Sequence, residues 1–80
     1  MKLRKRVGTR NICGARVTQA RKNLGMKQKE LLARLQVAGV DLSESTLSKL
    51  EGQTRAVSDR ELLAIADILG ISVAHLLGRE

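Results

Sequence analysis

Apolar residues recur along the chain at the three- and four-residue spacing of amphipathic helices, and glycines separate the apolar stretches. The first stretch predicts a helix over residues 11–24, with an apolar face formed by Cys13, Val17, Ala20 and Leu24. The second predicts a helix over residues 28–38, with an apolar face formed by Leu31, Leu32, Leu35 and Ala38. This pattern is typical of a bundle of short helices.

Capping signals mark the starts of three further helices. Ser43 is the expected N-cap of a helix that ends near residue 51. Ser58 and Glu61 have the spacing of a capping box, and the helix after them has an apolar face formed by Leu62, Ile65, Ala66 and Leu69. Ser72 caps a short helix that ends before residue 78. Five helices and no strand pattern predict an all-α fold.

The helix over residues 43–51 differs from the others because its apolar face is narrow. Only Leu47 and Leu50 have apolar positions that face a core. The opposite face and its flanks are polar and are formed by Glu44, Ser45, Thr46, Ser48 and Lys49. Such a helix packs by one edge and presents small polar side chains, which is the shape needed to enter the major groove of DNA.

Charge is distributed unevenly along the chain. The chain has 80 residues, which suffices for one small domain, and a net charge of +7. Residues 1–29 carry ten basic and no acidic side chains, whereas the rest carries five basic and eight acidic ones, so the two parts sum to +10 and −3. This asymmetry favours a polyanionic partner. We expect residues 1–10 to form a basic flexible arm and residues 11–78 to form the domain.

Several function classes are disfavoured by the composition. The chain has no Phe, Tyr or Trp, so it lacks the stacking platforms of most single-strand and RNA-binding modules. A single cysteine and a single histidine do not predict a metal site or a disulfide, and no spacing of catalytic groups indicates an enzyme or a cofactor. Cys13 is expected in the core and His75 in a surface or packing role.

No apolar run approaches the roughly 18 to 20 residues that span a membrane, and no signal-peptide core follows the basic start. We therefore expect a cytoplasmic, nucleoid-associated protein with no membrane partner.

The helices over residues 28–38 and 43–51, joined by a turn that contains glycine, predict a helix-turn-helix. Three stretches carry a resemblance to the Cro and phage-repressor (XRE-like) family, namely residues 21–25 (RKNLG), 28–31 (QKEL) and 45–52 (STLSKLEG). The resemblance extends over about residues 11–78. It implies a compact five-helix bundle of the phage-repressor type that binds double-stranded operator DNA as a two-fold homodimer, without a cofactor.

The resemblance also implies roles for residues of the third helix. Glu44, Ser45 and Lys49 would face base edges, with Ser48 beside them, and Thr46 would lie near a phosphate. Lys49 suits guanine O6 and N7, and Ser45 suits several bases. The alternative is a solvated helix face, and for Glu44 it is a charge that favours the helix dipole and repels phosphate.

Phosphate contacts are expected at both ends of the helix-turn-helix. By resemblance, Gln28 would bind a phosphate and brace the third helix. Lys27 stands at an N-cap where the family prefers Ser or Thr, so Lys27 and Lys29 either attract an anion to this helix start or simply leave it weakly capped. Three residues after the third helix would clamp a phosphate or form a plain surface loop: Gln53, Thr54 and Arg55.

Further expectations concern orientation. By resemblance, Arg21 and Glu51 form a buried structural ion pair between the first and third helices. Residues 36–42 exceed the family's tight turn by about five residues, and we expect a longer second helix and a longer turn. The basic arm, which contains Lys2, Arg4, Lys5 and Arg6, either reaches the minor groove or adds nonspecific attraction.

These features favour a sequence-specific transcriptional regulator of prokaryotic or phage type, most simply a repressor. The alternative is an antitoxin-like or adaptor protein whose main function is to bind another protein. Its surface would come from exposed aliphatic side chains among Val37, Val40, Ile68, Ile71 and Leu77.

Overall fold

The computed structural model describes residues 8–80, and every regular element within that range is a helix. The helices are α1 (Gly14–Asn23), α2 (Gln28–Val37), α3 (Glu44–Glu51), α4 (Asp59–Leu69) and α5 (Val73–Leu76). The expected all-α, five-helix fold is confirmed. Among residues 8–80, we find no helix with the length and hydropathy of a membrane span.

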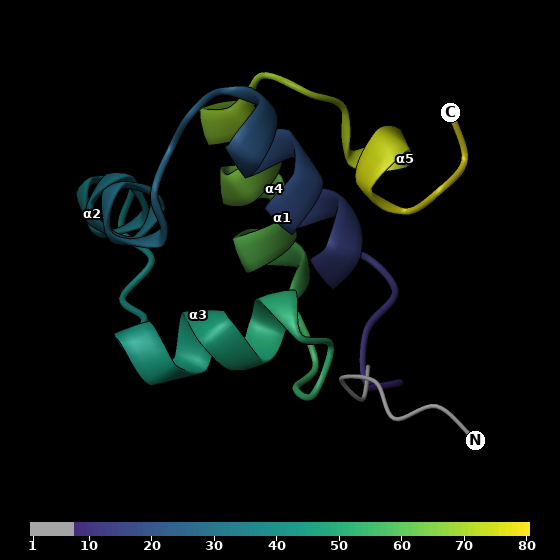
Figure 1. Ribbon diagram of the computed structural model, residues 1–80, viewed down its shortest axis with the longest axis horizontal. Coiled ribbons are helices and arrows are strands. Elements are labelled where there is room, and N and C mark those ends of the chain that lie inside the picture. Colours follow the sequence, from purple (N-terminus) through teal and green to yellow (C-terminus); the bar gives the residue numbers. More distant parts are fainter. Residues whose placement is uncertain (1–7) are drawn as a thin grey trace.

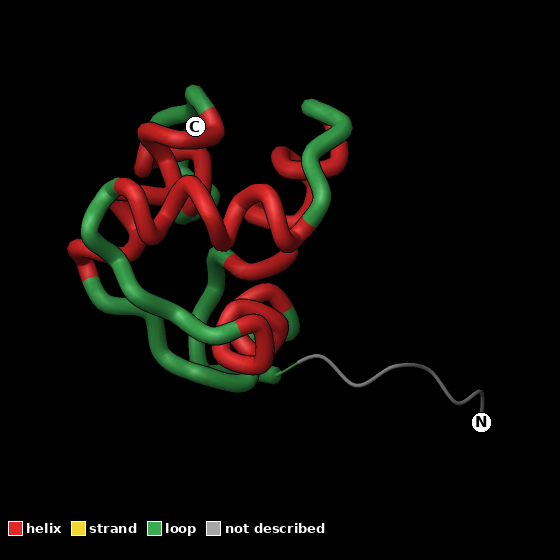
Figure 2. The backbone as a smooth tube through the Cα atoms, turned by 90° about the vertical axis from the view of Figure 1, so that its left-hand side faces the viewer, coloured by secondary structure: helices red, strands yellow, loops and turns green. Residues whose placement is uncertain are grey.

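The helices are arranged so that α3 lies at one edge of the bundle (Figure 1). The helices α1 and α4 contact each other, and α5 packs against both. Helix α3 contacts α1 and α2, and α2 also contacts α4. Figure 2 shows the helices in red and the loops that join them in green. The side of α3 that faces away from α1 and α2 is therefore free to meet a partner.

The core between the helices is built from aliphatic and sulfur-containing side chains only. It comprises Cys13, Val17, Met26, Leu31, Leu35, Leu42, Leu47, Leu50, Ile65, Ala66, Leu69 and Leu76. Each helix contributes at least one of these residues, so burial of one shared apolar cluster joins all five helices. Cys13 lies in this core, as the sequence predicted.

Serine side chains start three of the helices, as expected from the sequence. The Ser43 hydroxyl accepts a hydrogen bond from the backbone N–H of Thr46 at 3.0 Å. Ser58 and Glu61 form the reciprocal capping box, and Ser72 accepts from the N–H of His75. These bonds satisfy N–H groups that the first turn of a helix leaves without an intrahelical partner.

Two predicted core positions are wrong. Leu24 is 57% exposed, because α1 ends at Asn23 and the chain turns through the left-handed conformation of Gly25, which takes Leu24 off the apolar face. Ala38 is also exposed, because it follows the last residue of α2. Leu32, on the edge of the apolar face of α2, is only partly buried.

The connection between α2 and α3 is an ordered turn. Helix α2 ends at Val37, one residue before the predicted end. The chain reverses at Gly39, whose φ of 88° suits glycine, and the N–H of Val40 returns to the carbonyl of Leu35 at 2.8 Å. Leu42 then enters the core and leads into the N-cap of α3. The turn is thus ordered by its own hydrogen bond and by burial.

Candidate nucleic-acid interface

The outward face of α3 is polar and accessible. Glu44, Ser45 and Lys49 are exposed, whereas Leu47 and Leu50 on the inward face are completely buried. The side chains of Glu44, Ser45 and Lys49 make no hydrogen bond or ion pair with any described residue. The structure thus brings these three predicted base-reading residues together on one side of a helix whose other side is anchored in the core.

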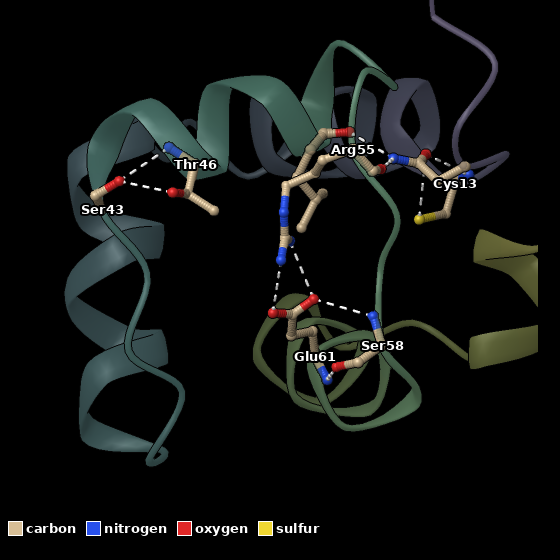
Figure 3. A network of polar contacts seen from close by, with 8 residues as sticks. Cys13, Ser43, Thr46, Arg55, Ser58 and Glu61 are labelled. Atoms are coloured by element: carbon tan, nitrogen blue, oxygen red, sulfur yellow. Dashed lines mark hydrogen bonds and ion pairs between the residues drawn. The ribbon is translucent and has the colours of Figure 1, made fainter.

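Ser48 and Thr46 differ from these three residues because they have partners within the chain. The Ser48 hydroxyl donates to Gln28 Oε1 at 3.2 Å. The hydroxyls of Thr46 and Ser43 lie 2.8 Å apart at the start of α3 (Figure 3). Each hydroxyl retains further hydrogen-bonding capacity toward a ligand. Ser48 therefore links α3 to α2 as well as lying on the exposed face.

Gln28 bridges the two helices of the helix-turn-helix. Its Nε2 donates to Glu51 Oε1 at 3.2 Å, and its Oε1 accepts from Ser48. Both partners lie on α3, whereas Gln28 is the first residue of α2. The bracing role implied for Gln28 is thus present as two hydrogen bonds that fix the start of α2 against α3.

A buried ion pair joins α1 to α3. Arg21 Nε lies 2.9 Å from Glu51 Oε2, and Arg21 Nη2 lies 3.0 Å from Glu51 Oε1. Arg21 Nη1 donates to the carbonyl of Met26, and Glu51 Oε1 also accepts from the hydroxyl of Thr18. The two charged side chains are only 10% and 7% exposed. A pair this well satisfied contributes a fixed geometry more surely than it contributes net stability.

The contact from Thr18 to Glu51 was not predicted from the sequence. Thr18 lies on α1, and Glu51 is 33 residues away. The only sequence signal is a hydroxyl residue three positions before Arg21 on the same helix, which brings both side chains to one face.

The start of α2 is weakly capped, as the sequence predicted. Lys27 occupies the N-cap, and its side chain makes no capping hydrogen bond. Glu30 pairs instead with Arg34 at 3.1 Å, one turn along the same helix. Lys27 and Lys29 are both exposed, so two cations flank a helix start that also carries the positive end of the helix dipole. This end of α2 is suited to an anion.

All three residues of the loop after α3 that were predicted to contact a phosphate have side-chain hydrogen bonds within the chain. Gln53 Nε2 donates to the carbonyl of Asn11 at 2.7 Å. The guanidinium of Arg55 forms paired bonds of 3.1 and 3.2 Å to Glu61 (Figure 3). Thr54 is exposed, and its hydroxyl donates to the carbonyl of Lys49. For Gln53 and Arg55, whose side chains are only partly exposed, these contacts favour the alternative of a surface loop.

Glu61 is an ionised anchor for this loop. Partial burial acts to raise its pKa, but hydrogen bonds from Arg55 and from the N–H of Ser58, together with the charge of Arg55, outweigh burial and lower the pKa. Glu61 therefore holds the loop to the start of α4 through its charged form.

The segment before α1 lies along the end of α3. The N–H of Gly8 donates to the carbonyl of Gly52 at 3.0 Å, and the N–H of Arg10 donates to the carbonyl of Gln53 at 2.9 Å. A Cβ on Gly8 would stand 2.1 Å from the Gln53 carbonyl oxygen, so the approach requires glycine. Residues 8–10 of the expected arm are thus hydrogen-bonded to the domain, and residues 1–7 lie outside the described residues.

The lone cysteine and histidine occupy unremarkable positions. Cys13 is 2% exposed, and burial raises the pKa of its thiol. His75 is exposed on α5. Within residues 8–80, no three His, Cys, Asp or Glu side chains come together in a way that would hold a metal ion.

A five-helix bundle that carries α2 and α3 as a helix-turn-helix, with a polar exposed face on α3 and cations at the start of α2, defines a DNA-binding protein of the helix-turn-helix class. A family model for the Cro/C1-type HTH DNA-binding domain matches residues 16–80. The chain belongs to this family, and the predicted family membership is confirmed.

A solved structure supports the same assignment. The chain is 33% identical to SinR, described as the master regulator for biofilm formation, in a crystal structure in complex with DNA. The match has a TM-score of 0.69 and covers 81% of this chain and 97% of the SinR chain. No curated protein matches the chain. The protein is a DNA-binding transcriptional regulator.

Proposed function

We propose that the protein is a repressor that binds a double-stranded DNA operator by placing the exposed face of α3 in the major groove. The observation that carries this proposal is the face formed by Glu44, Ser45 and Lys49, which is exposed and has no side-chain partner among the described residues. Lys49 suits guanine, Ser45 suits several bases, and Glu44 suits the amino group of cytosine. Ser48 lies on the same face, where its hydroxyl also serves the brace to Gln28.

Phosphate contacts would come from the borders of this face. Lys27 and Lys29 flank the uncapped start of α2, and Gln28 stands between them. Thr46 and Thr54 are further candidates, since both carry hydroxyls near the two ends of α3. Backbone contacts of this kind position a protein on DNA, and the base contacts supply specificity. Repression would follow from occupancy of the operator, without catalysis.

We further propose that two copies bind one operator. A two-fold dimer would place its α3 helices about 34 Å apart, one turn of B-DNA, on a pseudo-palindromic site. A protein of this kind would act in the cytoplasm, associated with the nucleoid.

Selection from a randomised duplex pool, followed by a salt titration with the enriched duplex, tests the proposal. We expect a two-fold symmetric site, and we expect log affinity to fall against log salt with a slope of about 0.9 per neutralised phosphate. Salt-sensitive binding with no enriched sequence would contradict sequence-specific recognition, and enrichment of a single half-site would contradict the dimer.

A second candidate function, binding of a protein partner, is favoured by one apolar surface. A groove of about 530 Å³ lies between the α2–α3 turn and α4, and its apolar lining includes Val40, Leu63 and Ile68. Beside it on α2, Val37 is 91% exposed, and within it Leu63 is 55% exposed. Exposed apolar surface of this kind often marks an interface. Purification of the chain from its native cells, with a Leu63→Asp variant as control, tests whether a partner chain binds in this groove.

A further inference from the structure

Asn11 connects the start of α1 to the end of α3 by using its whole side-chain amide. Its Nδ2 donates to the carbonyl of Leu50 at 3.1 Å and to the carbonyl of Arg55 at 2.8 Å. Its Oδ1 accepts from the backbone N–H of Cys13 at 3.1 Å and of Gly14 at 2.8 Å. An amide offers two donor hydrogens and two acceptor lone pairs, so the full capacity of this side chain is used.

Gln53 completes the same junction from the other side. Its Nε2 donates to the carbonyl of Asn11 at 2.7 Å, while Asn11 binds carbonyls that precede and follow Gln53 in the chain. Gln53 has a φ of 64°, a conformation that costs free energy in any residue other than glycine. The side-chain bond to Asn11 gives a reason for a non-glycine residue at this position.

Close backbone contact shows that the junction has little room to shift. A Cβ on Gly14, the first residue of α1, would stand 2.4 Å from the carbonyl oxygen of Leu50 and 2.7 Å from that of Glu51. The last turn of α3 is therefore in direct contact with the first turn of α1. Asn11 and Gln53 tie together two helix ends that are already as close as their backbones allow.

We propose that Asn11 is a positioning residue for DNA recognition, which sets the orientation of α3 without touching DNA. The Arg21–Glu51 pair fixes the last residue of α3 against the last turn of α1. Asn11 adds a second attachment on the carbonyl side of the same turn. Two separate attachments resist rotation of a helix better than one, so the contact residues of α3 keep a fixed geometry toward the bases. The inference rests on the proposed reading of DNA by α3.

The variant Asn11→Ser separates the two functions of this side chain. The serine hydroxyl can still accept from the N–H groups of Cys13 and Gly14, because serine, like asparagine, bonds to backbone groups two or three residues further along. It is too short to reach the carbonyls of Leu50 and Arg55, and it leaves the charge of the protein unchanged. Asn23→Ser, at the other end of α1, is the matched control, because within residues 8–80 the Asn23 side chain bonds only to Gln19 of its own helix.

The readout is the ratio of affinity for the selected duplex to affinity for a random duplex, measured well below the melting temperature of each variant. We expect Asn11→Ser to lower this ratio about threefold to tenfold, and Asn23→Ser to leave it unchanged. A variant that is merely less stable would keep the wild-type ratio in its folded fraction.

Gln53→Gly provides a second test, which can be used even if Asn11→Ser does not fold. Glycine relieves the positive φ while it removes the bond to Asn11, so the variant is expected to fold. It should lower the same affinity ratio, and it should speed amide hydrogen exchange at residues 52–54 in the free protein relative to α4.

The outcomes are distinct. Wild-type discrimination in both Asn11→Ser and Gln53→Gly overturns the positioning role and leaves the proposed function intact. A wild-type chain that selects no duplex overturns the proposed function and this inference with it. Reduced discrimination in Asn11→Ser and Gln53→Gly, with Asn23→Ser unchanged, supports the inference.

Discussion

Helices α3 and α4 begin in the same way and are held in different ways. Each starts at a serine N-cap, Ser43 in one and Ser58 in the other. Helix α4 then buries Ile65, Ala66 and Leu69 in the common core. Helix α3 buries only two leucines, and its last turn is fixed by polar contacts that centre on Glu51.

The two helices are held by different kinds of contact. Apolar burial is non-directional, so it stabilises α4 without demanding one orientation. Hydrogen bonds and ion pairs have narrow geometric limits, so they hold α3 at a defined angle with little apolar surface. A recognition helix needs that arrangement, because its outward face must stay polar while its orientation stays fixed. Five variants test this contrast, from the largest expected effect to the smallest.

Replacing Arg21 should have the largest effect. Arg21→Met leaves the carboxylate of Glu51 buried without its cation, and we expect a loss of about 3–5 kcal/mol in the free energy of unfolding. Urea denaturation followed by circular dichroism measures the change. Arg34→Met, which breaks an exposed pair, is the control and should cost less than about 0.5 kcal/mol. Equal losses in the two variants would contradict the polar anchoring of α3.

Truncation of the α4 core should come next. Ile65→Ala removes a completely buried side chain, and we expect a loss of about 3 kcal/mol in the free energy of unfolding. Because α4 lies outside the helix-turn-helix, the folded fraction should bind DNA with wild-type sequence preference. Leu63→Ala on the same helix is the control, since Leu63 is 55% exposed. A changed sequence preference in Ile65→Ala would contradict the conclusion that α4 contributes to stability and not to recognition.

Removal of the exposed lysine on α3 should reverse this pattern. Lys49→Ala is expected to change the free energy of unfolding by less than about 0.5 kcal/mol, and to weaken binding to the selected duplex by about 1–3 kcal/mol. Fluorescence anisotropy with labelled duplexes measures the affinity. Lys22→Ala removes the same charge from the exposed surface of α1 and controls for nonspecific attraction. If the two variants bind alike, Lys49 does not read bases.

Because α2 is weakly capped, substitution of Lys27 by serine should raise the free energy of unfolding and lower the affinity for DNA. Lys27→Ser supplies the missing cap acceptor and should raise the free energy of unfolding by about 1 kcal/mol. It also removes a cation, so the slope of log affinity against log salt should fall by about 0.9 if Lys27 meets a phosphate. Lys27→Ala separates the two effects, because it removes the charge without adding a cap. An unchanged slope in both variants would remove Lys27 from the interface.

The smallest effect concerns acid stability. Because the pKa of Glu61 is lowered in the folded protein, its contribution to stability is complete above its unfolded pKa and is lost as pH falls through the folded pKa. Glu61→Gln keeps an acceptor for the capping box but loses the charge. We expect it to cost about 0.5 kcal/mol at pH 7, and this deficit should vanish in acid. Urea midpoints measured between pH 7 and pH 3 test the trend, and a constant deficit would contradict it.

Local sequence signals predicted the elements well. The bonds that start α3, α4 and α5 join residues three positions apart, so a short stretch of sequence contains both partners. Leu24 was misplaced because periodicity alone does not reveal where a helix ends. The left-handed turn at Gly25 removed it from the face that its spacing assigned.

Long-range polar contacts could not be predicted from the sequence except where the family resemblance implied them. Arg21 and Glu51 are 30 residues apart, and only the resemblance paired them. Asn11 binds backbone carbonyls 39 and 44 residues away, which have no side-chain signature in the sequence. The roles of Gln53 and Arg55 were open for the same reason, since the segment that Gln53 meets and the carboxylate that Arg55 meets are set by the fold.

The buried thiol of Cys13 makes the junction of α1 and α3 observable. The chain has no aromatic residue and hence no useful intrinsic fluorescence, but it has a single cysteine. Cys13 is 2% exposed beside Asn11, and its raised pKa keeps it protonated and unreactive in the closed fold. A thiol reagent therefore labels the protein only when local opening at this junction or unfolding of the core exposes Cys13. Compared with the labelling rate of a free thiol, the labelling rate of the unmodified protein gives the free energy of the opening that exposes Cys13.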